Sequence, residues 1–202
     1  DAHSFPFWCC CDHRYLRSHT HSSPPGRAPV VVMRRDALSQ RVVVAVDPPA
    51  SAGEKANACG IVCVGLGEDG RCYVLDDCSA RRLRPAQWAR RVVDLFHQRN
   101  ADRIVVETNQ GGNMVEAVIR QVDANVAMRS VTARLGKKAR AEPVAALYEQ
   151  GRVSHVGAFP ELEDEMCSAI GEGQSPDRLD AMVWAVTELL LRRKTEPRVH
   201  TA

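Results

Sequence analysis

Four acidic residues stand where their carboxylates could act together. Asp47 ends one apolar run, Glu107 ends a second, and Asp177 and Asp180 open a helical segment three residues apart. This spacing puts Asp177 and Asp180 on one face of a helix. Clustered carboxylates repel one another and are costly to bury, and hard divalent cations such as Mg²⁺ or Mn²⁺ offset that cost. Two such ions about 3.5–4 Å apart can drive phosphodiester hydrolysis.

Each acid also has a purely structural interpretation. An Asp at a strand end often caps a loop, and Asp177 stands where an ordinary helix N-cap would stand. Asp180 could brace its neighbours without touching an ion. The prediction of a metal site therefore rests on the four acids together and on the order of the elements that carry them.

The elements that must position these acids follow from the hydrophobic pattern. Apolar and β-branched runs predict five strands, at 41–47, 59–66, 72–75, 102–107 and 125–133. Apolar residues at helical spacing predict helices from residue 85, after the turn at 109–113, and at 137–150, 159–169 and 177–193.

The resulting order, three strands, then a helix, a strand, a helix, a strand and the remaining helices, is that of the RNase H-like fold. We therefore predict an α/β fold with a mixed five-stranded sheet flanked by helices. The first and fourth strands of such a sheet lie side by side, so Asp47 and Glu107 should meet at one end of it.

Composition limits the alternatives. The 202 residues are 45% hydrophobic and 26% charged, as in ordinary globular proteins, and no run approaches the roughly 20 apolar residues of a membrane helix. The net charge is +2, with +3 in residues 1–41 and −1 in the rest. Because the body is nearly neutral, it would have to bind nucleic acid through a local patch.

The chain contains eight cysteines, and their spacing favours reduced thiols. Cys9, Cys10 and Cys11 are consecutive, the others are scattered, and no CxxC pair occurs. This pattern fits neither a disulfide framework nor an ordinary zinc site, because adjacent cysteines rarely chelate one tetrahedral ion.

The pattern also divides the chain. Residues 1–29 lack periodicity and contain a Ser-Ser-Pro-Pro-Gly break, which predicts a disordered or foreign leader. A linker is expected at 30–40, the RNase H-like nuclease domain at 41–193, and a flexible tail at 194–202.

Four ordered motifs resemble a known family. They are Val-Ala-Val-Asp47-Pro-Pro, Val-Val-Glu107-Thr-Asn-Gln-Gly-Gly-Asn-Met, Lys-Lys-Ala-Arg140-Ala-Glu-Pro and Ser-Pro-Asp177-Arg-Leu-Asp180-Ala-Met-Val-Trp-Ala. Over about residues 40–193 the sequence resembles the C-terminal nuclease domain of the large terminase subunit. That subunit is the DNA-packaging motor of tailed phages, prophages and gene transfer agents.

The resemblance implies a metal-dependent endonuclease that cuts concatemeric double-stranded DNA. Asp47, Glu107, Asp177 and Asp180 would be its catalytic residues and would bind two Mg²⁺ or Mn²⁺ ions. Many relatives carry another Asp where this chain has Pro176, so which of Asp177 and Asp180 binds metal directly stays open.

The resemblance also implies partners and a location. The partners would be double-stranded DNA, the terminase ATPase domain, the small terminase subunit and the portal protein, in the cytoplasm of the bacterial host and with no membrane. No GxxxxGK[ST] phosphate-binding loop occurs, so the motor's ATPase site is not in this sequence.

Candidate DNA contacts lie beside the motifs. The densest positive patch comprises Arg134, Lys137, Lys138 and Arg140, which would contact phosphates unless it is only a solvated helix start.

A second candidate contact precedes a predicted helix. Gly111 and Gly112 would let a phosphate approach backbone N–H groups, or would form a simple tight turn. Asn109 could hydrogen-bond DNA or a metal-bound water, or cap the helix.

Two other functions compete with the terminase nuclease. One is an RNase H-like junction resolvase, against which the Asn-Gln-Gly-Gly stretch argues. The other is a non-catalytic module that docks on DNA or on the portal. Cleavage of plasmid with Mn²⁺ would separate an enzyme from such a module.

Overall fold

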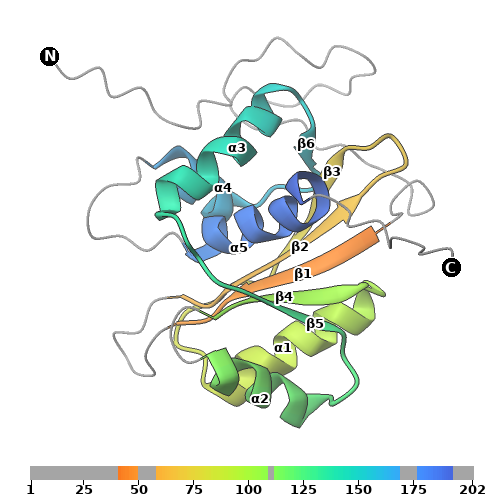
Figure 1. Ribbon diagram of the computed structural model, residues 1–202, viewed down its shortest axis with the longest axis vertical. Helices are drawn as coiled ribbons and strands as arrows, with labels where there is room; N and C mark the ends of the chain where they lie inside the picture. The colour runs from red at the N-terminus through yellow and green to blue at the C-terminus, as the bar shows by residue number, and fades with distance from the viewer. Residues whose placement is uncertain (1–40, 50–57, 109–111, 169–176, 193–202) are drawn as a thin grey trace, which may run out of the picture.

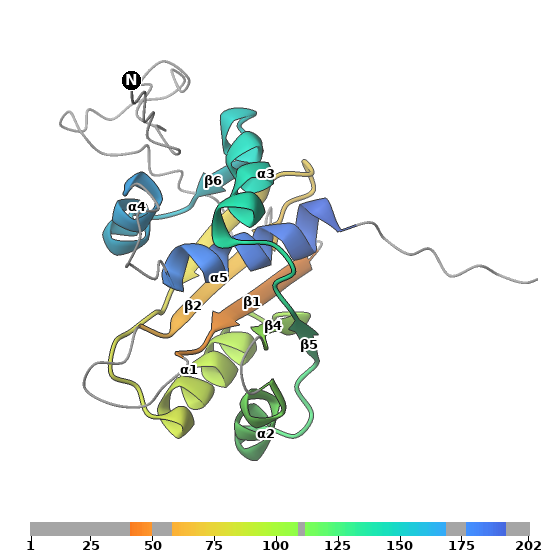
Figure 2. The same cartoon turned by 60° about the vertical axis from the view of Figure 1, so that its left-hand side comes forward.

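The computed structural model describes residues 41–49, 58–108, 112–168 and 177–192 (Figures 1 and 2). The predicted leader at 1–29, linker at 30–40 and tail at 194–202 lie outside these residues. None of the helices in the described ranges is long and apolar enough to cross a bilayer.

A single mixed sheet of six strands forms the centre of the domain. The strands are β1 (Arg41–Asp47), β2 (Gly60–Leu66), β3 (Cys72–Asp77), β4 (Arg103–Glu107), β5 (Met128–Val131) and β6 (Val153–His155). Their order across the sheet is β5-β4-β1-β2-β3-β6. β1 pairs in parallel with β4 and antiparallel with β2, as in the predicted RNase H-like arrangement.

The sheet has one strand more than the five that we expected. The additional strand, β6, pairs in parallel with the outer side of β3. It has only three residues, Val-Ser-His, which are too few to show an alternating pattern. β5 is also shorter than expected, with four residues instead of the nine at 125–133.

Among the described residues, five helices cover the two faces of the sheet. They are α1 (Pro85–Gln98), α2 (Gly112–Val122), α3 (Lys137–Glu149), α4 (Pro160–Cys167) and α5 (Asp177–Val186). Figures 1 and 2 show α1 and α2 on one face, and α3, α4 and α5 on the other.

Alternating side chains of β1 explain this three-layered arrangement. Val42, Val44 and Val46 pack in the core that α1 and α2 close, whereas Val43 and Ala45 pack in the core beneath α5. Because both faces are covered, the strand reads as a continuous apolar run. β1 is thus held rigidly, and so is the carboxylate at its end.

The last helix changes form before it ends. A single helix was expected over 177–193, but α5 continues as a π-helical turn, η2 (Thr187–Leu191). The Arg192 N–H donates to the Thr187 carbonyl oxygen at 3.0 Å, the i to i−5 bond of a π-helix. Such turns are rare and often stand at functional sites.

The buried cysteines match the expected reduced thiols. Cys59, Cys63 and Cys72 are free and buried. Burial raises the pKa of the Cys72 thiol to about 12. These thiols are therefore packing groups in the neutral form.

Candidate active site

The ends of two neighbouring strands bring Asp47 and Glu107 together. Val46 pairs with Val106 in the parallel register of β1 and β4, so the next residue of each strand stands at the same edge. The meeting of Asp47 and Glu107 that the sequence predicted is confirmed. Glu107 is buried, with 8% of its surface exposed.

A close approach of backbones brings the acids of α5 to the same edge. Gly60 is the register partner of Asp47 on β2. A Cβ atom on Gly60 would lie 1.9 Å from the backbone oxygen of Asp177, so only glycine lets α5 begin here. Asp177 and Asp180 are both buried in the first turn of α5.

The four carboxylates interact electrostatically. Burial, followed by repulsion from Glu107 and Asp180, raises the pKa of Asp47 from 3.8 to about 8. Asp177 adds to the rise, and Lys137 opposes it. No hydrogen bond or ion pair joins the Asp47 carboxylate to another residue in the described part of the chain. Asp47 is therefore the acid whose charge is least compensated.

Two cations from α3 partly neutralise the other acids. The Arg140 guanidinium lies between Glu107 and Asp180, with Nη1 3.3 Å from Glu107 Oε2 and Nη2 3.2 Å from Asp180 Oδ1. The Lys137 ammonium forms an ion pair with Asp180 Oδ2.

The pKa shifts of this ion pair show its balance. Burial opposes the charge of Lys137, but the bond to Asp180 and the attraction of Asp180, Asp47 and Asp177 together outweigh it, so the pKa of Lys137 is raised. Burial also raises the pKa of Asp180, and the positive charges of Lys137 and Arg140 oppose this rise without cancelling it. The pair is therefore held partly desolvated at the edge of the acidic cluster.

Trp184 is a part of the site that sequence reasoning missed. Its apolar helical surroundings indicated a core residue, yet Nε1 donates to Glu107 Oε2 at 2.5 Å. The Arg140 guanidinium also lies 4.8 Å from the centre of its ring. Its position four residues after Asp180, on the same helix face, was the available signal.

A carboxylate from another helix fixes the start of α5. Glu165 Oε2 on α4 accepts hydrogen bonds from the backbone N–H groups of Arg178 and Leu179, at 2.9 and 3.1 Å. Arg178 Nε also donates to Asp77 Oδ2 at the end of β3. Nothing local in the sequence identifies Glu165 as this cap, because the contact is tertiary.

The predicted DNA contacts separate into groups. Lys137 and Arg140 contact the acidic cluster, whereas Arg134 and Lys138 are exposed beside it. Gly112 begins α2, and Asn109 and Gly111 lie outside the described residues.

The donor set fits hard divalent cations. In the described part of the chain, no three or more His, Cys, Asp or Glu side chains are already arranged to hold a metal ion. The donors are nonetheless all carboxylate oxygens, the ligands that Mg²⁺ and Mn²⁺ prefer. Burial and then repulsion from neighbouring acids raise the pKa of Asp47, and a bound cation would offset both. Which acids bind metal stays a prediction.

Comparison with known proteins defines the family. The family model of the terminase RNase H-like domain matches residues 44–189. The chain belongs to this family. No curated protein matches it by sequence.

Solved structures of terminases share the fold. The large terminase nuclease of the thermophilic phage G20c has a TM-score of 0.56 at 16% identity, over 81% of this chain and 90% of that one. The large terminase of a second thermophilic bacteriophage has a TM-score of 0.59 at 14% identity, over 82% of this chain. The terminase domain described here spans 43% of the length of that second protein.

Proposed function

We propose that this terminase domain is a divalent-metal-dependent endonuclease that cuts double-stranded DNA during packaging. One observation carries the proposal. In a fold of the terminase nuclease family, four carboxylates from β1, β4 and the start of α5 gather at one edge of the sheet. RNase H-like nucleases generally use divalent metals. We infer that Asp47, Glu107, Asp177 and Asp180 hold two ions, Mg²⁺ or Mn²⁺.

The chain's own groups would have distinct roles in this chemistry. Bound divalent ions would supply Lewis-acid activation of a water and stabilisation of the leaving oxygen. Asp47 would bind from the rigid end of β1. Arg140 would orient Glu107 and Asp180 through its two bonds, with Trp184 fixing the same Glu107 oxygen. Lys137 would add positive charge where phosphate oxygens arrive.

The exposed cations beside the cluster favour a polyanionic substrate. Arg134 and Lys138 precede and follow the start of α3, next to the two cations that contact the acids. We infer that they contact the DNA backbone, and that Asn109, Gly111 and Gly112 approach it from the start of α2.

The proposal extends to the packaging assembly. By its family, this domain would work with the terminase ATPase domain, the small terminase subunit and the portal protein in the cytoplasm of a bacterial host. Its source could be a phage, a prophage or a gene transfer agent.

A plasmid assay tests the enzyme activity. Supercoiled DNA is incubated with the chain and Mn²⁺, with and without chelator, and nicked and linear products are measured. The matched variants are Asp47→Asn and Asp94→Asn, the second on the exposed side of α1. Cleavage that requires the metal, is lost in the first variant and persists in the second is expected. DNA binding without cleavage at any metal concentration would instead indicate a docking module.

A further inference from the structure

Four arginines surround one buried glutamate at the end of the sheet opposite the acidic cluster. Glu188, in η2, is 5% exposed. Its carboxylate oxygens lie 3.2–3.8 Å from guanidinium nitrogens of arginines that begin β1 and β4, belong to β5, and follow η2: Arg41, Arg103, Arg129 and Arg192. One carboxylate cannot neutralise four guanidinium groups, so these five side chains carry a net charge of +3.

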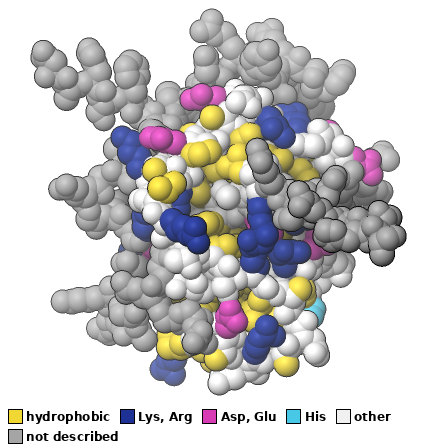
Figure 3. All heavy atoms as spheres, viewed as in Figure 1, with side chains coloured by type: hydrophobic (Ala, Val, Ile, Leu, Met, Phe, Trp, Pro, Cys, Tyr) yellow, Lys and Arg dark blue, Asp and Glu magenta, His cyan; other side chains and the backbone are white. Residues whose placement is uncertain are grey.

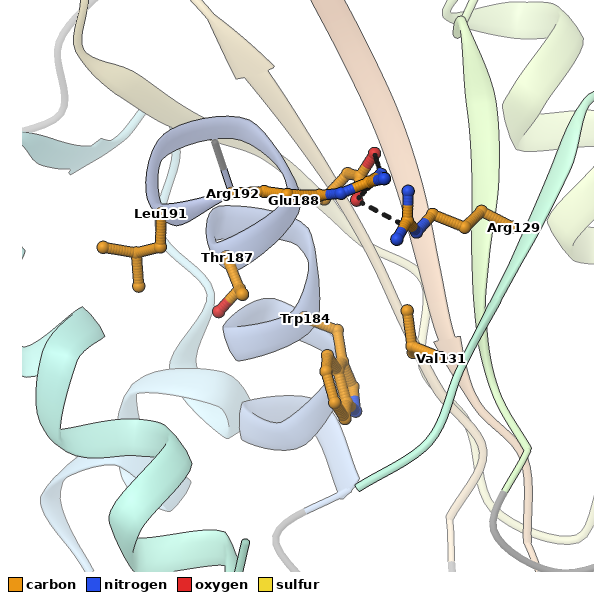
Figure 4. Close-up of a pocket in the computed structure, with 7 residues that line it drawn as sticks. All are labelled: Arg129, Val131, Trp184, Thr187, Glu188, Leu191 and Arg192. Carbon is orange, nitrogen blue, oxygen red and sulfur yellow. Dashed lines mark hydrogen bonds and ion pairs between the residues drawn. The ribbon is translucent and has the colours of Figure 1, made fainter. Parts of the chain in front are cut away.

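A hollow opens beside this cluster. Figure 4 shows the cavity, of about 240 Å³, with Arg129 and Arg192 meeting at Glu188 and with Trp184 and Thr187 along α5 and η2. We name it the arginine pocket. Figure 3 shows Lys and Arg side chains gathered across the middle of the face seen in Figure 1. Two arginines of the cluster, Arg129 and Arg192, line this hollow together with Glu188, so the concave surface itself carries more positive than negative charge.

The hydrogen-bonding capacity of the arginines is only partly used. Each guanidinium has five N–H donors, whereas Glu188 offers two oxygens to all four groups. Within the described residues, the buried Nε atom of Arg103 makes no hydrogen bond, and Arg129 Nε has only its ion pair with Glu188, at 3.5 Å. The four side chains are 25–40% exposed. Planar donors that face solvent in excess of their acceptors match an anion with several oxygens, of which phosphate is the best fit.

Position and size identify the source of the phosphate. Trp184 lines the pocket and also donates to Glu107, so one side chain links the pocket to the acidic cluster at the other end of the sheet. Asp180 and Glu188 are eight helical residues apart, roughly 12 Å, which is within the reach of one short stretch of a DNA strand. The cavity is also smaller than the roughly 300–1,000 Å³ of pockets that enclose a whole small ligand. A single backbone phosphate fits better than a free nucleotide.

We propose that the arginine pocket holds a backbone phosphate of the DNA, within a few nucleotides of the bond that is cut. This inference rests on the nuclease function proposed above. The pocket would fix the register of the strand, because its position is set by the same helix that carries Asp177 and Asp180.

DNA binding measured without cleavage tests the pocket. Anisotropy of a labelled 20-base-pair duplex is followed against KCl concentration in the presence of chelator, for the parent and for Arg129→Gln/Arg192→Gln. The expected result is weaker binding and a log–log salt slope that is smaller by about 0.9 for each phosphate released. The matched control is Arg90→Gln/Arg120→Gln, which removes the same charge from exposed positions on α1 and α2.

Two further variants distinguish a lost DNA contact from a folding defect. Arg192→Gln alone removes the most exposed arginine of the cluster and should weaken binding in the same direction. Glu188→Gln removes the competing carboxylate and should tighten DNA binding. If the arginines only brace η2, these variants lower the melting temperature but leave DNA affinity equal to the control, which overturns the proposal.

Competition with inorganic phosphate distinguishes a phosphate of the DNA backbone from a free anion as the ligand of the pocket. Comparison of cleavage with binding distinguishes this proposal from the nuclease proposal. Inorganic phosphate at low millimolar concentration should not displace the duplex; displacement would assign the pocket to a free anion instead. A parent that cleaves plasmid while its arginine variants bind DNA like the control refutes the pocket alone. A parent that binds through the arginines but never cleaves refutes the nuclease alone.

Discussion

The two ends of β1 carry clusters of opposite net charge. At the Asp47 end, four acids face two cations, Lys137 and Arg140. At the Arg41 end, four arginines face the single acid Glu188. The α5–η2 segment runs between the ends and contributes acids to both. Neither cluster is a closed set of ion pairs, so each keeps charge available for a ligand of opposite sign.

The largest effect is expected from a substitution of Asp47, the acid of the cluster whose negative charge is least offset by neighbouring cations. Asp47→Asn should slow plasmid cleavage by orders of magnitude, because it removes a carboxylate around which both ions would be placed. The melting temperature in chelator should not fall, since the substitution relieves repulsion. A variant that nicks plasmid at the parental rate would remove Asp47 from the site.

The two acids of α5 should differ in how much activity they control. Asp180 is already bonded to Lys137 and Arg140, so Asp180→Asn should cost about 10–100-fold and recover with added Mn²⁺. Asp177→Asn should be the more damaging change. A Mn²⁺ titration of cleavage by both variants decides between them. If only Asp180→Asn is inactive at every concentration, Asp177 is a helix cap and the assignment is reversed.

Displacing α5 should damage the acidic end without changing any charge. An added Cβ in Gly60→Ala would collide with the backbone of Asp177, and overpacking of this kind typically costs about 1–3 kcal/mol. We expect a lower urea midpoint and a loss of cleavage larger than the loss of folded protein explains. Gly157→Ala is the control, because its Cβ would meet only the Phe159 ring, at 3.5 Å. Equal behaviour of the two variants would show that α5 does not depend on Gly60.

A pH dependence of stability also belongs to the acidic end. The pKa of Asp47 is raised from 3.8 to about 8, so the folded chain holds this proton more tightly than the unfolded chain does. Stability should therefore fall as the pH rises from about 4 to 8, and this contribution should be constant above that range. Urea midpoints in chelator should show a flatter profile for Asp47→Asn. If the urea midpoint of Asp47→Asn depends on pH as that of the parent does, Asp47 is not the group responsible.

The parts of the fold that could be predicted are those with a strong local pattern. The apolar runs that end at Asp47 and Glu107 specified two buried strands, and the fold order placed their ends together. The short strand β6 and the π-helical turn were not predicted. Three residues show no period, and the leucines of η2 continue the apolar residues of α5 in the sequence. Both depend on packing against distant residues.

The candidate active site, too, could be predicted only in part. The four acids were predicted from residue type and position, and their role at the site stays a prediction, whereas the RNase H-like terminase family is confirmed. Trp184, Glu165 and Glu188 were missed, because each acts through a contact between segments far apart in sequence. Lys137 and Arg140 were interpreted as phosphate contacts, and their bonds to Asp180 and Glu107 became visible only in three dimensions. Their contact with DNA stays a prediction.

The order of strand lengths across the sheet has a consequence for how the domain behaves when isolated. The outer strands β5 and β6 have four and three residues, whereas the inner strands β1 and β2 have seven each. Unpaired backbone groups at a sheet edge can recruit a strand from another molecule, and short edge strands limit that pairing. The long, continuously apolar strands with the highest tendency to aggregate are flanked by partners on both sides. Intermolecular strand pairing therefore requires the sheet to open first, which protects the domain at high concentration.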